Sequence, residues 1–128
     1  MKLITTLAVL FLATFASIDR VLADEVIASG TFVGKSDHVT KGAASIQKNA
    51  EGNYVVVLGK DFSLDGAPDP KVGLGNDGYQ REARLGKLEK KKGEQVYMIP
   101  ANLNPFDFNE IWIWCERFSV PLGVAALQ

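Results

Sequence analysis

Cysteine and histidine are nearly absent from this sequence of 128 residues, which contains one of each, Cys115 and His38. A single cysteine cannot form an internal disulfide, although small exported domains often depend on disulfides, so the fold must be stabilised by its core. A mononuclear copper site needs a cysteine and two histidines, and a zinc site needs three or four convergent ligands. We therefore predict no metal site and no cofactor in this chain.

The same scarcity leaves little room for a catalytic centre. Cys115 and His38 are the only possible nucleophile–base pair of the cysteine type, oriented by Asp37, Asp69 or Asp107, and no local spacing marks such a pair. No glycine-rich loop opens a helix, which excludes a phosphate-binding loop. The sequence therefore assigns no enzymatic activity beyond a possible redox thiol.

An excess of positive charge is also missing, since the formal net charge is −1. The one charge run, around Lys90-Lys91-Lys92, is typical of a solvated hairpin tip. The charge balance therefore predicts no nucleic-acid partner.

Long hydrophobic runs are limited to residues 3–18. Lys2 precedes this run, and Val21-Leu22-Ala23 follows it with the small-x-small pattern of a signal-peptidase site. The run is short for an uncleaved membrane anchor. We predict a cleaved signal peptide at 1–23 and a secreted or periplasmic domain at 24–128, with no membrane segment after cleavage.

Helical periodicity is absent from 24–128, where short alternating segments recur between glycine and proline turns. The polar stretch 75–84 is expected to be an exposed loop, and 119–127, which contains Pro121, an edge strand. The pattern predicts one monomeric all-β domain, a small antiparallel β-sandwich or partly closed barrel. Expected strands are 25–34, 43–48, 54–58, 61–65, one starting at Val72, 95–100, 110–118 and 119–127.

The segment 110–118 contains both tryptophans and the cysteine, and its β-branched and aromatic residues favour a central strand. Side chains alternate along a strand. Ile111, Ile113 and Cys115 are therefore expected on one face, and Trp112, Trp114 and Glu116 on the other. Tryptophans on a central strand usually belong to the core, although here they also offer a stacking surface or an electron relay beside Cys115.

Several short motifs occur in the order found in one known family. They are Gly30-Thr31-Phe32, His38 followed by Gly42, Asp61-Phe62, Gly66-Ala67-Pro68-Asp69, Gly93-Glu94-Gln95-Val96-Tyr97 with Ile99-Pro100, Ile113-Trp114-Cys115 with Phe118, and Leu122-Gly123-Val124-Ala125-Ala126-Leu127. Together they resemble the electron-transfer DM-thirteen domain. The resemblance covers essentially all of 24–128.

This resemblance implies a small β domain with one characteristic cysteine, matched by Cys115, and a role in redox or electron transfer. In larger proteins the domain is joined to heme-binding DOMON domains and membrane cytochrome b modules, which implies a redox or heme-protein partner for this single-domain chain. Pro70 stands where many members have an apolar residue, which predicts a shorter strand after it.

A redox thiol needs some exposure and nearby positive charge. Cys115 is expected near the end of its strand, with Arg117 on the same face two residues further on. His38 and Asp69 lie in loops that could reach the same rim, and Trp114 is adjacent. The predicted site is therefore Cys115, with His38, Asp69, Trp114 and Arg117 as binding candidates.

Two hypotheses follow from the residues and the resemblance. The first is an exported redox or electron-transfer domain that uses Cys115. The second is a non-enzymatic module that binds a protein or small ligand at its loops, with Cys115 as core packing.

Overall fold

The computed structural model describes residues 24–128; the signal-peptide prediction for 1–23 lies outside these described residues. Within them no helix is long and apolar enough to cross a membrane. The strands are β1 Glu25–Gly34, β2 Thr40–Lys41, β3 Ala43–Lys48, β4 Tyr54–Leu58, β5 Ser63–Leu64, β6 Pro70–Gly75, β7 Tyr79–Lys87, β8 Gln95–Met98, β9 Glu110–Cys115 and β10 Val120–Ala126, and one 3₁₀ helix, η1, spans Pro105–Asp107.

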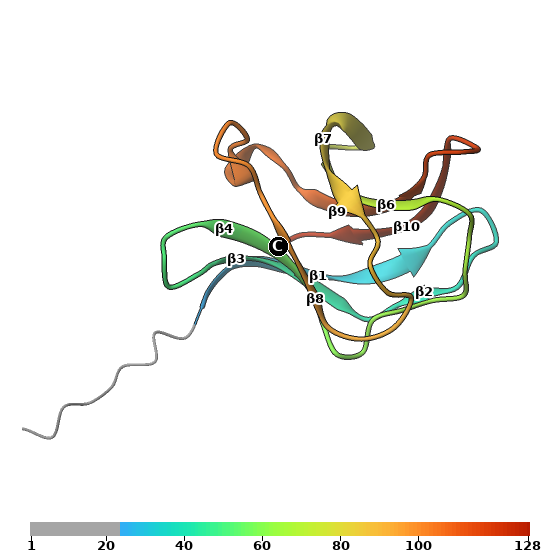
Figure 1. Cartoon of the computed structure of the whole chain (residues 1–128), viewed down its shortest axis with the longest axis horizontal. Coiled ribbons are helices and arrows are strands. Elements are labelled where there is room, and N and C mark those ends of the chain that lie inside the picture. The colour runs from blue at the N-terminus through green and yellow to red at the C-terminus, as the bar shows by residue number, and fades with distance from the viewer. Residues whose placement is uncertain (1–23) are drawn as a thin grey trace, which may run out of the picture.

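Eight of these strands form one antiparallel sheet in the order β7-β6-β9-β10-β1-β3-β4-β8. The sheet curls so that its two edge strands, β7 and β8, approach each other and the barrel is nearly closed (Figure 1). β2 and β5 form a separate two-stranded ladder. The predicted all-β, partly closed barrel is confirmed, with more strands than the sequence pattern indicated.

β9 is a central strand, as its composition predicts, and it pairs with β6 on one side and with β10 on the other. Ile111, Ile113 and Cys115 point into the barrel and are at most 1% exposed. Trp112 and Trp114 point to the outer face. Residue alternation along one strand therefore places the thiol and the indoles on opposite sides of the same sheet.

The core fills the inside of the barrel and draws on nearly every strand. Its largest fully buried side chains are Phe62, Ile46, Leu58, Leu64, Leu74, Ile111, Ile113 and Leu122. The chain has no disulfide, and Cys115 is a free, buried thiol. Apolar packing and backbone pairing thus hold the fold together.

The prediction of an edge strand at 119–127 is wrong, because β10 lies between β9 and β1. Pro121 lacks an N–H group and was expected to exclude an interior position. The register of β10 against β9 shifts between Pro121 and Gly123, which is a bulge. A bulge accommodates proline inside a sheet. Pro70 is likewise tolerated as the first residue of β6, and that strand still spans Pro70–Gly75.

The prediction of an exposed loop at 75–84 is also wrong, because most of it belongs to β7. β7 pairs with β6 along its length. Ala83 is its one fully buried side chain, so β7 has almost no hydrophobic alternation. Its strand conformation depends on pairing with β6 and on side-chain contacts with β9, which a local pattern does not contain.

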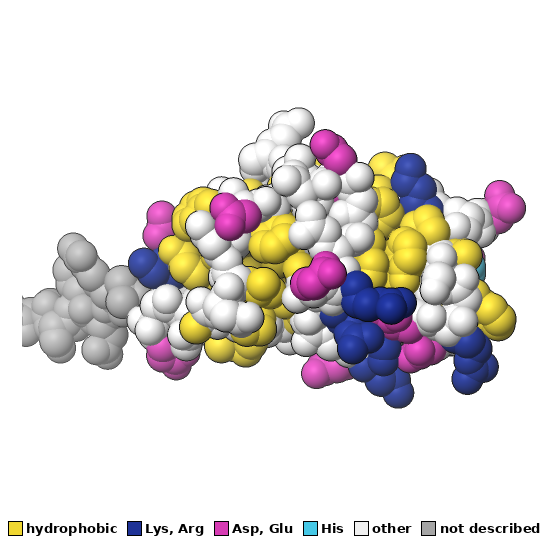
Figure 2. Space-filling model, turned by 90° about the horizontal axis from the view of Figure 1, so that it is seen from above, with side chains coloured by type: hydrophobic (Ala, Val, Ile, Leu, Met, Phe, Trp, Pro, Cys, Tyr) yellow, Lys and Arg dark blue, Asp and Glu magenta, His cyan; other side chains and the backbone are white. Residues whose placement is uncertain are grey.

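Charges of both signs cover the surface. In Figure 2, lysine and arginine side chains gather on one part of the visible face, with acidic side chains among them. Lys90, Lys91 and Lys92 are exposed in the connection between β7 and β8, as expected for a solvated charge run.

Candidate functional site

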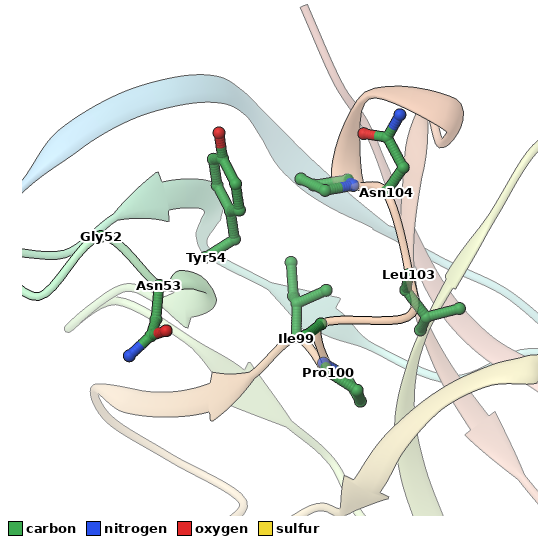
Figure 3. A pocket seen from close by; sticks show the side chains of 9 residues that line it. Gly52, Asn53, Tyr54, Ile99, Pro100, Leu103 and Asn104 are labelled. Carbon is green, nitrogen blue, oxygen red and sulfur yellow. The ribbon is translucent and has the colours of Figure 1, made fainter.

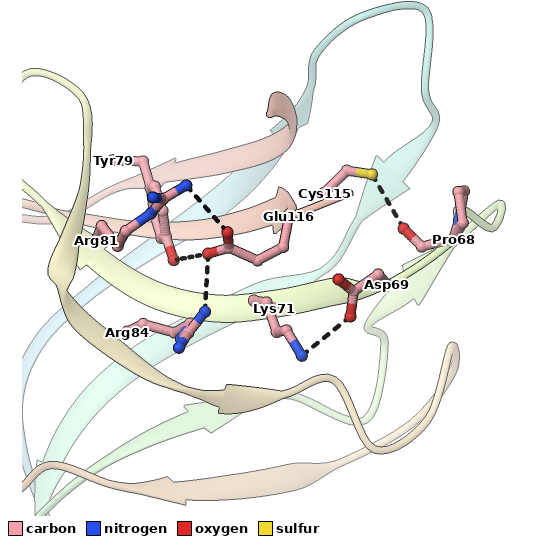
Figure 4. Close-up of polar contacts among 8 residues, drawn as sticks. All are labelled: Pro68, Asp69, Lys71, Tyr79, Arg81, Arg84, Cys115 and Glu116. Atoms are coloured by element: carbon pink, nitrogen blue, oxygen red, sulfur yellow. Dashed lines mark hydrogen bonds and ion pairs between the residues drawn. The ribbon is translucent and has the colours of Figure 1, made fainter. Parts of the chain in front are cut away.

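Cys115 is the last residue of β9 and lies under the turn that leads into β6. Its Sγ is 3.0 Å from the carbonyl oxygen of Pro68, to which the thiol donates a weak hydrogen bond (Figure 4). The Cys115 backbone pairs with Pro70, and the Glu116 amide donates to the Asp69 carbonyl at 3.2 Å. The thiol is therefore buried within the hydrophobic core, and its hydrogen bond is to a backbone oxygen of the turn before β6.

The turn before β6 has a constrained backbone. Gly66 has φ +122° and Asp69 has φ +54°, a region that L-residues rarely occupy. The Asp69 carboxylate turns away from the thiol and pairs with Lys71 Nζ at 3.0 Å. The predicted approach of Asp69 to Cys115 thus occurs through the backbone of residue 69 and not through its side chain.

Arg117 lies beyond the end of β9, in the exposed turn 116–119. Alternation along a strand holds only while the backbone stays extended, and β9 ends at Cys115. Strand parity therefore does not bring Arg117 to the side of the thiol. Among the described residues, Arg117 forms no ion pair.

His38 contacts Asp65, which is none of the three aspartates, Asp37, Asp69 and Asp107, that the sequence offered as its partner. Its Nδ1 is 2.9 Å from Asp65 Oδ1, and Asp65 Oδ2 accepts the Val39 amide at 3.0 Å. This contact joins the loop after β1 to the chain after β5, beside the β2–β5 ladder. His38 and Asp65 therefore form a loop clasp, with Asp65 three residues before Pro68, whose carbonyl accepts from the Cys115 thiol.

The clasp is expected to make stability depend on pH at the acidic end. The amide of Val39, and then His38, lower the pKa of Asp65 below its ordinary 3.8. A lowered folded-state pKa stabilises the native state above the ordinary value, and this contribution is lost as pH falls through the folded value. Urea unfolding of the wild type and of Asp65→Asn should therefore differ at neutral pH and converge in acid.

The matched control is Asp37→Asn, because Asp37 is a nearby exposed aspartate with positive φ. Its difference from the wild type is expected to be small, because Asp37 supplies none of the contacts of the clasp. Equal pH profiles for wild type and Asp65→Asn would contradict the role of the clasp.

The outer face of β9 carries a second cluster of polar and aromatic groups. Tyr79 of β7 stacks on Trp114, with ring centroids 4.7 Å apart and planes 10° from parallel. The Tyr79 hydroxyl donates to Glu116 Oε1 at 3.1 Å. Arg81 and Arg84 pair with the same carboxylate at 3.3 and 3.2 Å (Figure 4). Trp114 was a predicted site residue, whereas Tyr79, Arg81 and Arg84 were not.

Glycine in β6 makes room for the Tyr79 ring. A Cβ on Gly73 would lie 2.6 Å from Tyr79 Cε2, a distance that real Cβ contacts do not reach. The one sequence signal for this cluster was Gly73, between Val72 and Leu74 of a predicted strand, because glycine inside a strand often marks a close approach.

Burial and the neighbouring carboxylate also affect the acidity of the phenol. Desolvation, and then the hydrogen bond to Glu116, raise the pKa of Tyr79 to about 12. Tyr79 therefore keeps its proton at neutral pH. Trp114 differs from Tyr79 in its hydrogen bonding, since its Nε1 is buried and has no hydrogen-bond acceptor among the described residues.

A surface pocket of about 380 Å³ lies between the β3–β4 turn and the loop that contains η1 (Figure 3). Tyr54, Ile99 and Leu103 supply apolar surface, and Asn53 and Asn104 supply amide groups. A few polar groups around an apolar pocket are typical of ligand sites. In residues 24–128 no group of three His, Cys, Asp or Glu side chains could hold a metal ion.

The fold and these sites define a small antiparallel β domain with one buried thiol at the end of its central strand. The chain belongs to the Electron transfer DM13 family, whose model matches residues 31–127. This confirms the family resemblance and supports an electron-transfer role at the level of the family. No curated protein and no solved structure is significantly similar to the chain.

Proposed function

We propose that this chain is an exported electron-transfer domain that uses Cys115 as its redox thiol and acts on a redox or heme-protein partner in the exported compartment. Membership of the electron-transfer family carries the proposal. Cys115 lies at a strand end, where its Sγ contacts a carbonyl of the turn before β6. A monomeric domain with a single cysteine has to exchange electrons with a second molecule.

Thiol–disulfide exchange is the covalent chemistry available to a lone thiol. Cys115 Sγ attacks a partner disulfide, one partner S–S bond breaks and one mixed disulfide forms. The displaced partner sulfur leaves as a thiolate and takes up the proton lost from Cys115. Because Cys115 is 1% exposed, this reaction requires the turn around Pro68 to open.

Native-state labelling with Ellman's reagent tests this access. Opening of the turn alone exposes little surface, so the labelling rate is expected to depend only weakly on urea at low concentration. A thiol that reacts only after global unfolding would instead show the full urea dependence of unfolding. That result would favour core packing and the second hypothesis.

Two glycine variants make the labelling test specific. Gly66→Ala strains the turn that contacts the thiol, because Gly66 has φ +122°, while the added Cβ would meet no atom closer than Lys91 Nζ at 3.7 Å. It is expected to speed labelling about tenfold, since an L-residue in such a conformation costs roughly 1–2 kcal/mol. Gly52→Ala is the matched control, with φ +83° in the β3–β4 turn, and should leave labelling at the wild-type rate.

Cleavage of the signal peptide during export can be tested separately. N-terminal sequencing of the protein recovered from the exported fraction is expected to begin at Asp24, after the small-x-small pattern at 21–23. A mature chain that still begins at Met1 would contradict cleavage. The electron-transfer proposal would then be judged by the labelling of Cys115 alone.

The pocket between the β3–β4 turn and η1 favours a second candidate function, the binding of a small ligand or peptide by a non-enzymatic module. In that case Cys115 is core packing. Cys115→Ala would then keep the function, whereas Tyr54→Ala, which removes one wall of the pocket, would lose it. Comparing these two variants in a partner-binding assay separates the two functions.

A further inference from the structure

The outer face of β9 contains a buried polar atom that the fold alone does not explain. Trp114 Nε1 is enclosed without a hydrogen-bond acceptor among residues 24–128. Trp112, two residues earlier on the same face, donates its indole N–H to Glu110 at 3.2 Å. Buried polar groups are nearly always paired, so an unpaired one calls for a physical reason, and a redox role is one of those reasons.

The phenol stacked on Trp114 is arranged in the opposite way. Tyr79 lies parallel to the indole at 4.7 Å, and its hydroxyl donates directly to a carboxylate, Glu116 Oε1, at 3.1 Å. One ring of the stack thus has no acceptor for its proton, and the other has a carboxylate in hydrogen-bond contact. On oxidation, Tyr79 can therefore pass a proton to Glu116, whereas Trp114 has no such acceptor. This difference favours electron transfer from Tyr79 to an oxidised Trp114.

We propose that Trp114 and Tyr79 form a one-electron relay on the outer face of the sheet, with Glu116 as the proton acceptor for Tyr79. The relay serves an outer-sphere one-electron oxidant, such as a metal complex or a partner's redox group, that approaches this face. This inference rests on the proposed electron-transfer function but does not involve the thiol of Cys115.

The steps balance in electrons, protons and charge. The oxidant takes one electron from Trp114, which becomes an indole radical cation, and the oxidant is reduced by one electron. Because Nε1 has no acceptor, the cation keeps its proton and remains oxidising. Tyr79 then returns one electron to Trp114, the phenolic O–H bond breaks, and the proton bonds to Glu116. The products are neutral Trp114, a neutral Tyr79 phenoxyl radical and protonated Glu116.

The surrounding residues hold this arrangement in place. Arg81 and Arg84 fix the two oxygens of Glu116, and Gly73 leaves the space in which the Tyr79 ring lies. The raised pKa of Tyr79, about 12, keeps the phenol protonated, so that its oxidation is coupled to proton loss. The arginine side chains are 67% and 44% exposed, which leaves positive charge at the rim for an anionic oxidant.

Pulse radiolysis with the azide radical provides the test, because this radical oxidises tryptophan by one electron. In the wild-type protein the indole radical is expected to decay into a phenoxyl radical, with a rate independent of protein concentration. Tyr79→Phe keeps the ring stack and should abolish this phenoxyl signal. Glu116→Gln keeps the shape of the acceptor but is a far weaker base, so transfer should slow about 100-fold.

Matched controls come from residues outside the relay. Tyr97 donates its hydroxyl to Gln95 and not to a carboxylate, so Tyr97→Phe should keep the phenoxyl signal. Trp112→Phe should also keep it, because Trp112 stacks on no tyrosine among the described residues. Circular dichroism of each variant verifies the fold before the kinetics are compared.

A phenoxyl signal that survives in Tyr79→Phe, or an unchanged rate in Glu116→Gln, would overturn the relay. The labelling experiment on Cys115 reports on a different group. If labelling follows global unfolding while the phenoxyl radical forms as expected, the thiol proposal fails and the relay stands. If labelling shows local opening and no transfer to Tyr79 occurs, the relay fails and the thiol proposal stands.

Discussion

Replacement of Ile113 by alanine is expected to lower the free energy of unfolding by about 3 kcal/mol, within the range for large-to-small changes in a well-packed core. Ile113 is fully buried and pairs with Val72 of β6 and Gly123 of β10. Strands on both sides limit how far the backbone can move into the cavity. Most of the cavity cost should therefore remain, and urea unfolding followed by tryptophan fluorescence measures it.

The control for this prediction is an apolar side chain at the surface. Val33 of β1 is 61% exposed, so Val33→Ala removes little buried area and should change stability by less than about 0.5 kcal/mol. A loss of under 1 kcal/mol for Ile113→Ala would mean that β9 relaxes around the gap, and that the core is less tightly constrained than its burial indicates.

The central position of β9 could be predicted because its evidence is local. Apolar residues on both faces of one short segment require cover on both sides, whatever the partners are. Alternation then sets Ile113 and Cys115 apart from Trp114. The end of the strand near Cys115 was also visible, since Glu116 and Arg117 follow the apolar run. These features depend on neighbours in sequence and therefore survive without knowledge of the fold.

The contacts of the candidate site depend on distant segments, and the sequence pattern did not contain them. The His38–Asp65 contact joins residues 27 apart in the sequence, and no local pattern indicated Asp65 as the partner. Tyr79 was assigned to a loop, yet its hydroxyl bonds Glu116, 37 residues away. The sequence contains many aspartates and loops that could supply such a contact. Which of them meets a given side chain depends on the order of the strands in the sheet, and local periodicity does not set that order.

Replacement of Gln95 by alanine is expected to cost about 3 kcal/mol, although Gln95 is polar and lies on the edge strand β8. Gln95 is 4% exposed. Its amide donates to the Lys90 and Gly93 carbonyls and accepts from the Lys90 amide and the Tyr97 hydroxyl, which is 2.6 Å away. Alanine would leave several of these buried groups unpaired, each at a cost of about 1–3 kcal/mol unless water reaches it.

The loss of stability in Gln95→Ala should be greatest where β7 and β8 approach each other, a contact region termed the seam. Tyr97 accepts the Glu89 amide at 3.0 Å, which ties the chain just after β7 to β8. Without Gln95 to hold Tyr97, amide hydrogen exchange is expected to speed up first in β7, the strand that carries Tyr79. Gln47→Ala is the matched control, because the Gln47 side chain is partly buried and bonds only the Ser45 hydroxyl among the described residues.

Gln47→Ala should therefore change stability by about 0.5–1 kcal/mol and leave exchange in β7 unchanged. If Gln95→Ala accelerated exchange uniformly over the sheet, the seam would not be a separate opening unit. The Gln95 network would then stabilise the barrel as a whole, and Tyr79 would be held by the pairing of β7 with β6 and by its own contacts with Trp114 and Glu116.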